Sequence, residues 1–180
     1  MLVLLTFLKN LKKNLPFDKF FIVQNNIIGI VPSSIICETL KFLKLNEFCR
    51  FDLLVDICAV DYPEKKNRFE INYILLSITY NQRMVIKTYV DEITPIHSVV
   101  KIFNNSNWLE REAWDMFGIF FQNHPDLRRI LTDYGFVGYP FRKDFPLTGF
   151  IEYRYDDVNK AVKGEVLELS QELRMFGNFF

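Results

Sequence analysis

The feature that most limits how this chain can fold is a long stretch, residues 119–149, in which apolar side chains follow no period of 2 or 3.6. Disordered segments have few aromatic and aliphatic residues, and structureless loops of this length are uncommon inside a compact domain. This stretch is rich in both; they are Phe120, Phe121, Ile130, Leu131, Tyr134, Phe136, Val137, Tyr139, Phe141, Phe145 and Leu147. We therefore expect an extended segment that buries apolar side chains against another protein.

A short amphipathic helix is predicted directly before this stretch. Asn107 can cap its N-terminus, with Glu110 at the capping-box position, and Gly118 can end it in the left-handed conformation. Arg111 and Asp115 are four residues apart and are predicted to pair along one face. Glu110 and Glu112 are only two residues apart, so they project to different sides and do not form a convergent acid–base pair.

The remainder of the chain mixes short apolar runs of both periods. The predicted elements are strands within 20–31 around a turn at 24–26, a helix over 33–45, strands at 51–60, 69–80 and 84–90, helices at 96–103 and 108–117, and a possible edge strand at 152–158. Hairpins and mixed runs indicate an α+β fold, with a mixed, largely antiparallel sheet, helices on one face and a long extended C-terminal tail. We expect an α+β domain over 1–118 and an extended, partner-wrapping segment over 119–180.

Composition excludes several function classes. Lys plus Arg and Asp plus Glu are both 22, so the net charge is zero and no nucleic-acid partner is indicated. The chain contains no glycine-rich phosphate-binding motif. Its three cysteines, Cys37, Cys49 and Cys58, have no C-x-x-C spacing, and its two histidines, His97 and His124, have no metal-ligand spacing. We expect no metal, no cofactor and no catalytic residue.

The N-terminus, MLVLLTFLKNLKKNLP, is too short in apolar residues to span a membrane and carries its lysines after the apolar run, unlike a secretory signal. We interpret it as a short amphipathic helix ending at Pro16. Residues encoded by AT-rich codons (Phe, Tyr, Met, Ile, Asn and Lys) far outnumber Gly, Ala, Arg and Pro. This bias indicates an organellar gene.

Charged residues on both sides of Gly118 are predicted to pair with one another. They are Glu110, Arg111, Glu112 and Asp115 on the helix, and Arg128, Arg129, Arg142, Lys143 and Asp144 beyond it. Arginine binds carboxylates bidentately, and buried pairs of this kind fix the register of a segment more reliably than they stabilise it. His124 is predicted to make hydrogen bonds. Arg128 and Arg129 are adjacent in an extended segment, so one should face this domain and the other a partner.

The motifs in this region carry a resemblance to a known family. The residues ERE, WDMFGI, HPDLRRIL and RKDFPLTG, in this order within 107–149, resemble the hydrophilic 30 kDa-type subunit (NADH dehydrogenase subunit 9) of respiratory complex I. The resemblance extends more loosely from about residue 20 to the end. Tyr139 departs from the family, which more often has His there, and Gly164 and Glu165 stand where Glu and Pro are expected.

The resemblance implies a non-catalytic structural subunit in the quinone-reducing module of the peripheral arm of an NADH:ubiquinone oxidoreductase. Its implied partners are chiefly the 49 kDa-type subunit and iron–sulfur subunits, on the matrix side of the mitochondrial inner membrane. Flavin and clusters would lie in other subunits. The alternative is a free-standing enzyme that uses carboxylates and His124, although no nucleophile–base or metal pattern supports it.

Overall fold

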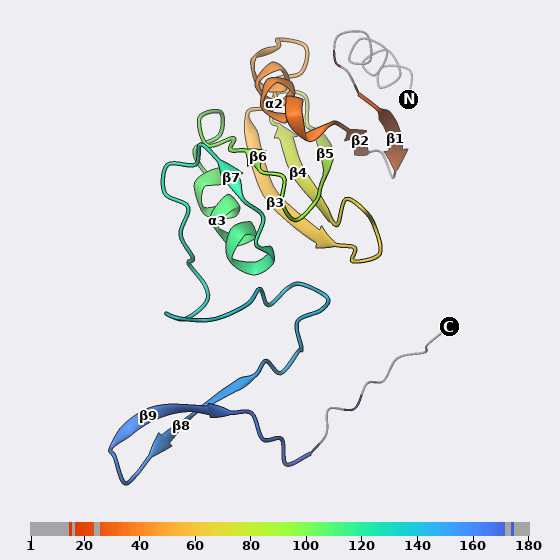
Figure 1. Cartoon of the computed structure of the whole chain (residues 1–180). Helices are drawn as coiled ribbons and strands as arrows, with labels where there is room; N and C mark the ends of the chain where they lie inside the picture. Colours follow the sequence, from red (N-terminus) through yellow and green to blue (C-terminus); the bar gives the residue numbers. More distant parts are fainter. Residues whose placement is uncertain (1–14, 16, 24–25, 172–173, 175–180) are drawn as a thin grey trace.

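The computed structural model describes residues 15, 17–23, 26–171 and 174. Its largest unit is a five-stranded sheet in the order β1-β2-β5-β4-β3 (Figure 1). The strands are β1 (Lys19–Val23), β2 (Asn26–Ile30), β3 (Leu53–Asp61), β4 (Phe69–Ser77) and β5 (Gln82–Val90). Only β2 and β5 are parallel; the other neighbours are antiparallel. The α+β prediction, with a largely antiparallel mixed sheet, is confirmed.

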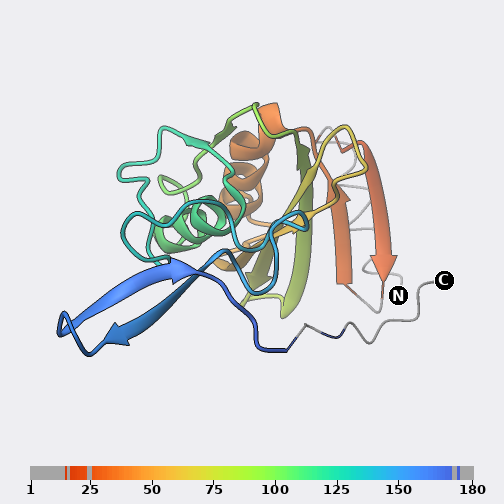
Figure 2. The same ribbon diagram turned by 60° about the horizontal axis from the view of Figure 1, so that its bottom comes forward.

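Two α-helices lie on the same face of this sheet, α2 (Ile36–Leu45) and α3 (Ser106–Phe117), as Figures 1 and 2 both show. A 3-10 turn, η1 (Ser33–Ile35), leads into α2, so the helix predicted over 33–45 is present but its α-helical part begins at Ile36. Alternation along β4 builds the core beneath the helices, because the period of a strand turns every second residue to one face. The fully buried residues on that face of β4 are Phe69, Ile71, Tyr73 and Leu75. Ile36, Leu40 and Leu43 of α2 are fully buried too.

The predicted helix at 96–103 is wrong. Residues Ile96–His97 form a short strand, β6, that pairs in parallel with β7 (Phe121–Gln122), and turns follow it. The Ile96 amide donates to the Phe120 carbonyl at 3.0 Å and the Ser98 amide to the Gln122 carbonyl at 2.9 Å. These amides thus donate to carbonyl groups distant in sequence and not to carbonyls of a local helix.

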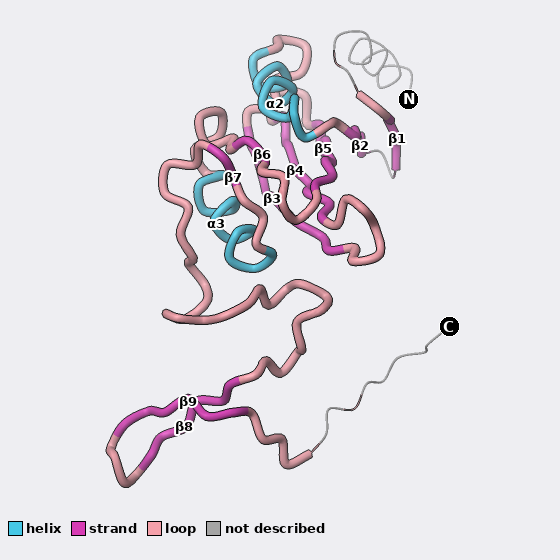
Figure 3. The backbone as a smooth tube through the Cα atoms, in the orientation of Figure 1, coloured by secondary structure: helices cyan, strands magenta, loops and turns pink. Residues whose placement is uncertain are grey.

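Beyond β7 the chain contains no regular element until the antiparallel hairpin of β8 (Ile151–Asp156) and β9 (Ala161–Val166). Figure 3 shows the long loop between them and the hairpin standing away from the five-stranded sheet. The strand predicted at 152–158 is present as β8, which begins one residue and ends two residues earlier, but it pairs only with β9 and does not join the main sheet. The predicted N-terminal helix lies outside the described residues.

The chain division at 118 stays a prediction. In the structure the segment just after Gly118 belongs to the body, because Ile119 and Phe121 are buried in the core and β7 pairs with β6. Within the described residues, no helix has the length and apolar character that crossing a bilayer would require.

Candidate functional site

The motifs ERE and WDMFGI begin on helix α3, and HPDLRRIL and RKDFPLTG follow it in the chain. This helix carries two carboxylates with no solvent exposure, Glu110 and Asp115. The helix starts two residues earlier than predicted, with Asn105 at the N-cap position and no side-chain capping bond. Asn107 is therefore not the cap, and Glu110 is not a capping-box partner. The Asn105 amide instead donates to the Leu54 carbonyl at 2.5 Å, which ties the start of the helix to β3. The predicted end is confirmed, since Gly118 has φ of 77° and its amide donates to the Trp114 carbonyl.

Asp115 is the first of two anchors that hold the irregular segment after β7 on the body. Its carboxylate accepts hydrogen bonds from the amides of residues 130–132, at 2.7–3.1 Å, and from the Thr132 hydroxyl at 2.6 Å. Burial alone would raise the pKa of Asp115, but these hydrogen bonds outweigh it and lower the pKa below its usual value. One buried carboxylate thus accepts the hydrogen bonds that backbone carbonyls would accept in a helix or sheet.

Glu110 plays a similar part on the other side of the helix. It accepts hydrogen bonds from the Ser98 hydroxyl at 2.6 Å and the Val99 amide at 2.7 Å, just after β6. Burial raises the pKa of Glu110 to about 7, although the hydrogen bonds act in the opposite direction. The enclosed His124 ring has Nε2 3.9 Å from this carboxylate and 3.2 Å from the Asn107 carbonyl. Burial lowers the pKa of His124.

Two further charges of α3 do not form the pairs expected of them. The Arg111 guanidinium lies over the Trp108 ring and donates through Nε to the Arg128 carbonyl at 3.2 Å, so the predicted Arg111–Asp115 pair is wrong. Glu112 is exposed, while Glu110 is buried. The expectation that these two glutamates point to different sides is confirmed.

Arg128 and Arg129 face in different directions. The Arg129 side chain is 29% exposed; its Nε lies 3.8 Å from Asp115, and it donates to the carbonyls of Phe136 and Gly138 at 3.1 Å each. The Arg128 side chain is 71% exposed and pairs with Asp126, which is also exposed, at 3.0 Å. The inward-facing arginine is therefore Arg129.

Tyr139 fills the space above the helix end. Its ring packs against Trp114 at 6.1 Å between centroids, and both Arg129 and Arg142 lie over it. A Cβ at Gly118 would come within 2.6 Å of this ring, so both the positive φ and the close approach require glycine there. Some aromatic residues of the irregular stretch thus pack on their own domain.

A second anchor joins the stretch to the loop between β3 and β4. The Lys143 amide donates to Asp61 at 2.8 Å, and the Asp144 carboxylate lies 3.0 Å from the Arg68 guanidinium. Arg68 also forms a two-point pair with Asp61, at 2.6 and 2.9 Å. Burial would raise the pKa of Asp61, but its bonds to Arg68 and Lys143 lower it.

Arg142 completes this second anchor and donates to the Phe117 carbonyl at 2.6 Å and to Glu92 at 3.4 Å. Sequence reasoning missed Asp61, Arg68 and Glu92. Opposite charges at the two ends of a hairpin turn, Asp61 and Arg68, were a signal for a local pair. Nothing in the sequence connected that pair to residues some eighty positions later.

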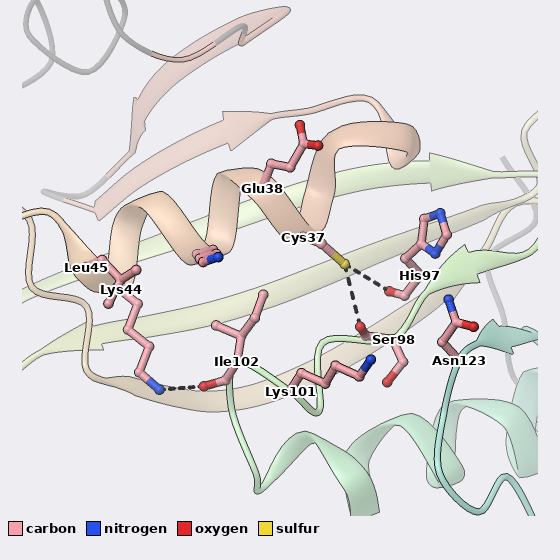
Figure 4. A pocket seen from close by; sticks show the side chains of 10 residues that line it. Cys37, Glu38, Lys44, Leu45, His97, Ser98, Lys101, Ile102 and Asn123 are labelled. Atoms are coloured by element: carbon pink, nitrogen blue, oxygen red, sulfur yellow. Dashed lines mark hydrogen bonds between the residues drawn. The ribbon is translucent and has the colours of Figure 1, made fainter.

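A hollow of about 480 Å³ lies between α2 and the segment after β6 (Figure 4). The Cys37 thiol donates to the carbonyls of His97 and Ser98, and the Lys44 ammonium donates to the Ile102 carbonyl. Burial, with Glu110 and Glu38, raises the pKa of Cys37, so the thiol stays protonated and is a poor nucleophile. The hollow does not assemble a nucleophile with a base.

The cysteines do not make a ligand set. Cys37 lies on α2, Cys49 is buried after that helix, and Cys58 is exposed on β3 beside Asp56. Burial raises the pKa of Cys49 and of Cys58 to about 11 each. Among the residues that the structure describes, no three His, Cys, Asp or Glu side chains are grouped to hold a metal ion.

Known proteins resemble this chain in both sequence and fold. The family described as "Respiratory-chain NADH dehydrogenase, 30 Kd subunit" matches residues 30–151. NADH-ubiquinone oxidoreductase subunit 9 of Reclinomonas americana is 58% identical over 149 residues, which cover 83% of this chain and 72% of the relative. NADH dehydrogenase [ubiquinone] iron-sulfur protein 3 of Solanum tuberosum is 58% identical over 139 residues, covering 77% and 73%.

A solved structure shares the fold as well. A chain of the membrane-bound sulfane sulfur reductase, an archaeal respiratory membrane complex, superposes with a TM-score of 0.69 at 25% identity, covering 79% of this chain and 85% of that one. The family match spans most of the chain and includes α3 and both anchors. The resemblance inferred from the motifs is confirmed: the chain belongs to the family of the 30 kDa subunit of respiratory-chain NADH dehydrogenase, a component of respiratory complex I.

Proposed function

We propose that this chain is a non-catalytic structural subunit of the quinone-reducing module of complex I, on the matrix side of the mitochondrial inner membrane. In this role it contacts chiefly the 49 kDa-type subunit and iron–sulfur subunits. It supports the transfer of electrons from NADH to ubiquinone by holding its neighbours in place. Residues 119–180 supply most of that contact.

The buried charges support a structural role. Asp115 and Glu110 use their oxygens on backbone amides and hydroxyls of this chain, and Arg129 donates to backbone carbonyls. Asp115 and Arg129 thereby position the segment 123–148, and Glu110 positions the residues just after β6. None of these contacts places a general base beside a nucleophile.

The observation that carries the proposal is the apolar surface along residues 131–166. Monomeric proteins rarely expose contiguous apolar surface over such a length, and exposed surface of this kind marks contact sites. Its large exposed residues are Leu131, Tyr134, Val137, Phe141, Leu147, Phe150, Ile151, Tyr153, Tyr155, Val158, Val162 and Val166. A large multisubunit assembly offers the neighbours that would cover it.

Some relatives are named iron-sulfur proteins, and a cluster in this chain would need suitable ligands among its own residues. Iron–sulfur clusters are bound by four ligands, usually cysteine thiolates. The three cysteines of this chain belong to separate elements and have raised pKa values, so they do not fit such a cluster. We assign no cluster to this subunit.

Quinone reduction in the assembled complex tests the proposal. The variants Glu112→Gln and His124→Gln remove the two groups that a catalytic role would need most, one exposed and one enclosed. NADH:ubiquinone turnover, normalised to the amount of complex assembled on native gels, should equal that of the unsubstituted complex. Normal assembly with turnover reduced a hundredfold or more would contradict a non-catalytic role.

A further inference from the structure

The hairpin of β8 and β9 has two chemically distinct faces. Its register pairs Ile151 with Val166, Tyr153 with Gly164 and Tyr155 with Val162, and paired residues share a face. These residues form the apolar face. The alternate residues are Glu152, Arg154, Asp156, Ala161, Lys163 and Glu165, and they form the charged face.

Every large side chain of the apolar face is more than half exposed; the fractions are 56% for Ile151, 58% for Tyr153, 57% for Tyr155, 68% for Val162 and 81% for Val166. Gly164, in the middle of this face, has no side chain, and the Tyr153 ring lies beside it. A lone two-stranded hairpin is marginally stable in water. Within the described residues, nothing covers this face.

The charged face needs no such cover. Arg154 lies 2.5 Å from Glu165, and Lys163 lies 2.5 Å from Asp156, so cross-strand pairs already balance these charges. Exposed pairs of this kind persist in water at little cost. The orientation of the hairpin on a partner follows: the apolar face points inward and the charged face points to solvent.

We propose that the apolar face of the hairpin docks on a neighbouring protein subunit. The surface it fits is flat and apolar, with hydrogen-bond acceptors for the hydroxyls of Tyr153 and Tyr155. This inference rests on the proposed function, because the neighbour is another subunit of the same assembly.

Charge decides between a protein and a membrane as the occupant. Acidic residues outnumber basic ones in the hairpin and its flanks; they are Glu152, Asp156, Asp157, Glu165 and Glu168 against Arg154, Lys160 and Lys163. An anionic bilayer surface attracts basic segments and repels an acidic excess. A protein surface with an apolar centre and basic side chains at its rim complements the hairpin.

Two adjacent residues provide a matched test in the full chain. Val162→Lys puts a charge on the apolar face, and Ala161→Lys puts the same charge on the opposite face, beside Asp156. Val162→Thr keeps a β-branched side chain, and therefore the strand preference, while it removes apolar surface. Each protein is titrated into the peripheral-arm subcomplex that lacks this chain, and incorporation is read on native gels.

We expect the unsubstituted chain and Ala161→Lys to incorporate at the same concentration. Val162→Lys should need at least about tenfold more chain, with Val162→Thr in between, because an unpaired charge is costly to bury in an apolar interface. Thermal melts of the free variants should coincide. Equal incorporation of Val162→Lys and Ala161→Lys would overturn the docking inference and leave the proposed function standing. Failure of the unsubstituted chain to incorporate would overturn both.

Two further measurements exclude other occupants. Size-exclusion chromatography with light scattering should give a monomer mass for the unsubstituted chain, and a dimer lost in Val162→Lys would assign the face to a second copy. Vesicles of phosphatidylcholine with phosphatidylglycerol should not sediment the chain. Sedimentation that Val162→Lys changes would assign the face to lipid. Either result would overturn a neighbouring subunit as the occupant.

Discussion

The irregular segment 123–148 and the hairpin that follows it differ in how closely they are attached to the body of the domain. The anchored segment, residues 123–148, has no helix or strand, yet its backbone amides donate to buried groups of the body at Asp115, Asp61 and Met116. The hairpin of β8 and β9 is regular, yet every residue in it except Asp156 is exposed. A segment can therefore bond to the body without regular secondary structure, and a regular hairpin can remain exposed.

The difference lies in where the backbone hydrogen bonds go. A hairpin pairs about half of its amides and carbonyls between its own two strands and leaves the outer ones to solvent, so its backbone needs no acceptor from the body. A segment without periodicity needs acceptors from outside, and buried carboxylates supply several from one side chain. The anchored segment thus depends on the fold of the body, while the hairpin depends on a partner for its burial.

The largest expected effect concerns Asp115. Asp115→Ala removes the acceptor of three backbone amides and leaves Arg129 without its carboxylate, so we expect a loss of about 3–5 kcal/mol in the free energy of unfolding. Urea titration of the full chain measures this loss. Asp126→Ala, at an exposed ion pair, is the control and should cost less than about 1 kcal/mol. Equal stability of the two variants would mean that the segment is not anchored at this point.

The pH dependence of stability reports on the second buried carboxylate. The pKa of Glu110 is raised from 4.5 to about 7 in the folded chain, so its stabilising contribution is full below pH 4.5 and is lost as the pH rises through 7. The loss is about 3 kcal/mol at most. Glu110→Gln should abolish it, which urea titrations between pH 4.5 and 8 can measure.

His124 contributes with the opposite sign, because its lowered pKa makes stability fall as the pH drops through its titration. The His124 ring lies 3.9 Å from Glu110, so the comparison of His124→Gln with the double variant Glu110→Gln/His124→Gln isolates Glu110. A difference that stays constant across this pH range would contradict the burial of a titrating carboxyl.

The adjacent arginines provide a comparison inside the anchored segment. Arg129→Ala removes two hydrogen bonds to backbone carbonyls and the partner of Asp115, and should cost about 2 kcal/mol. Arg128→Ala should change stability by about 0.5 kcal/mol or less, because its side chain is exposed. Thermal melts of the full-length variants separate the two. If Arg128 were the costlier residue, the orientation described above would be reversed.

The smallest expected effect is on the hairpin. Tyr155→Ser should leave the melting of the free chain unchanged within about 0.5 kcal/mol, since the ring contacts solvent. The same substitution at Tyr139, which packs against Trp114 and beneath two arginines, should cost about 1–2 kcal/mol. Calorimetry of both variants makes the comparison, and matching losses would show that the hairpin packs on the body.

Local pattern was sufficient for much of the fold. The alternation of β4 and β5, the Pro-Ser-Ser start of the segment leading into α2 and the left-handed Gly118 each depend on residues close in sequence, and each was predicted. The helix predicted at 96–103 failed because β7 and Glu110 capture its amides from more than ten residues away. The prediction of Asn107 as the cap was wrong, because the Asn105 side chain donates to the Leu54 carbonyl of β3 and the helix begins just after it.

The sequence by itself determined the α+β class, the family and the concentration of charge on both sides of Gly118. These follow from composition, periodicity and motif order, which are properties of neighbouring residues. Only the tertiary structure decided which charges meet. Asp115 holds 130–132, Asp61 reaches Lys143, and Arg129 rather than Arg128 turns inward. An irregular segment has no period that sets its direction, so its path is fixed by buried acceptors whose positions depend on the whole fold.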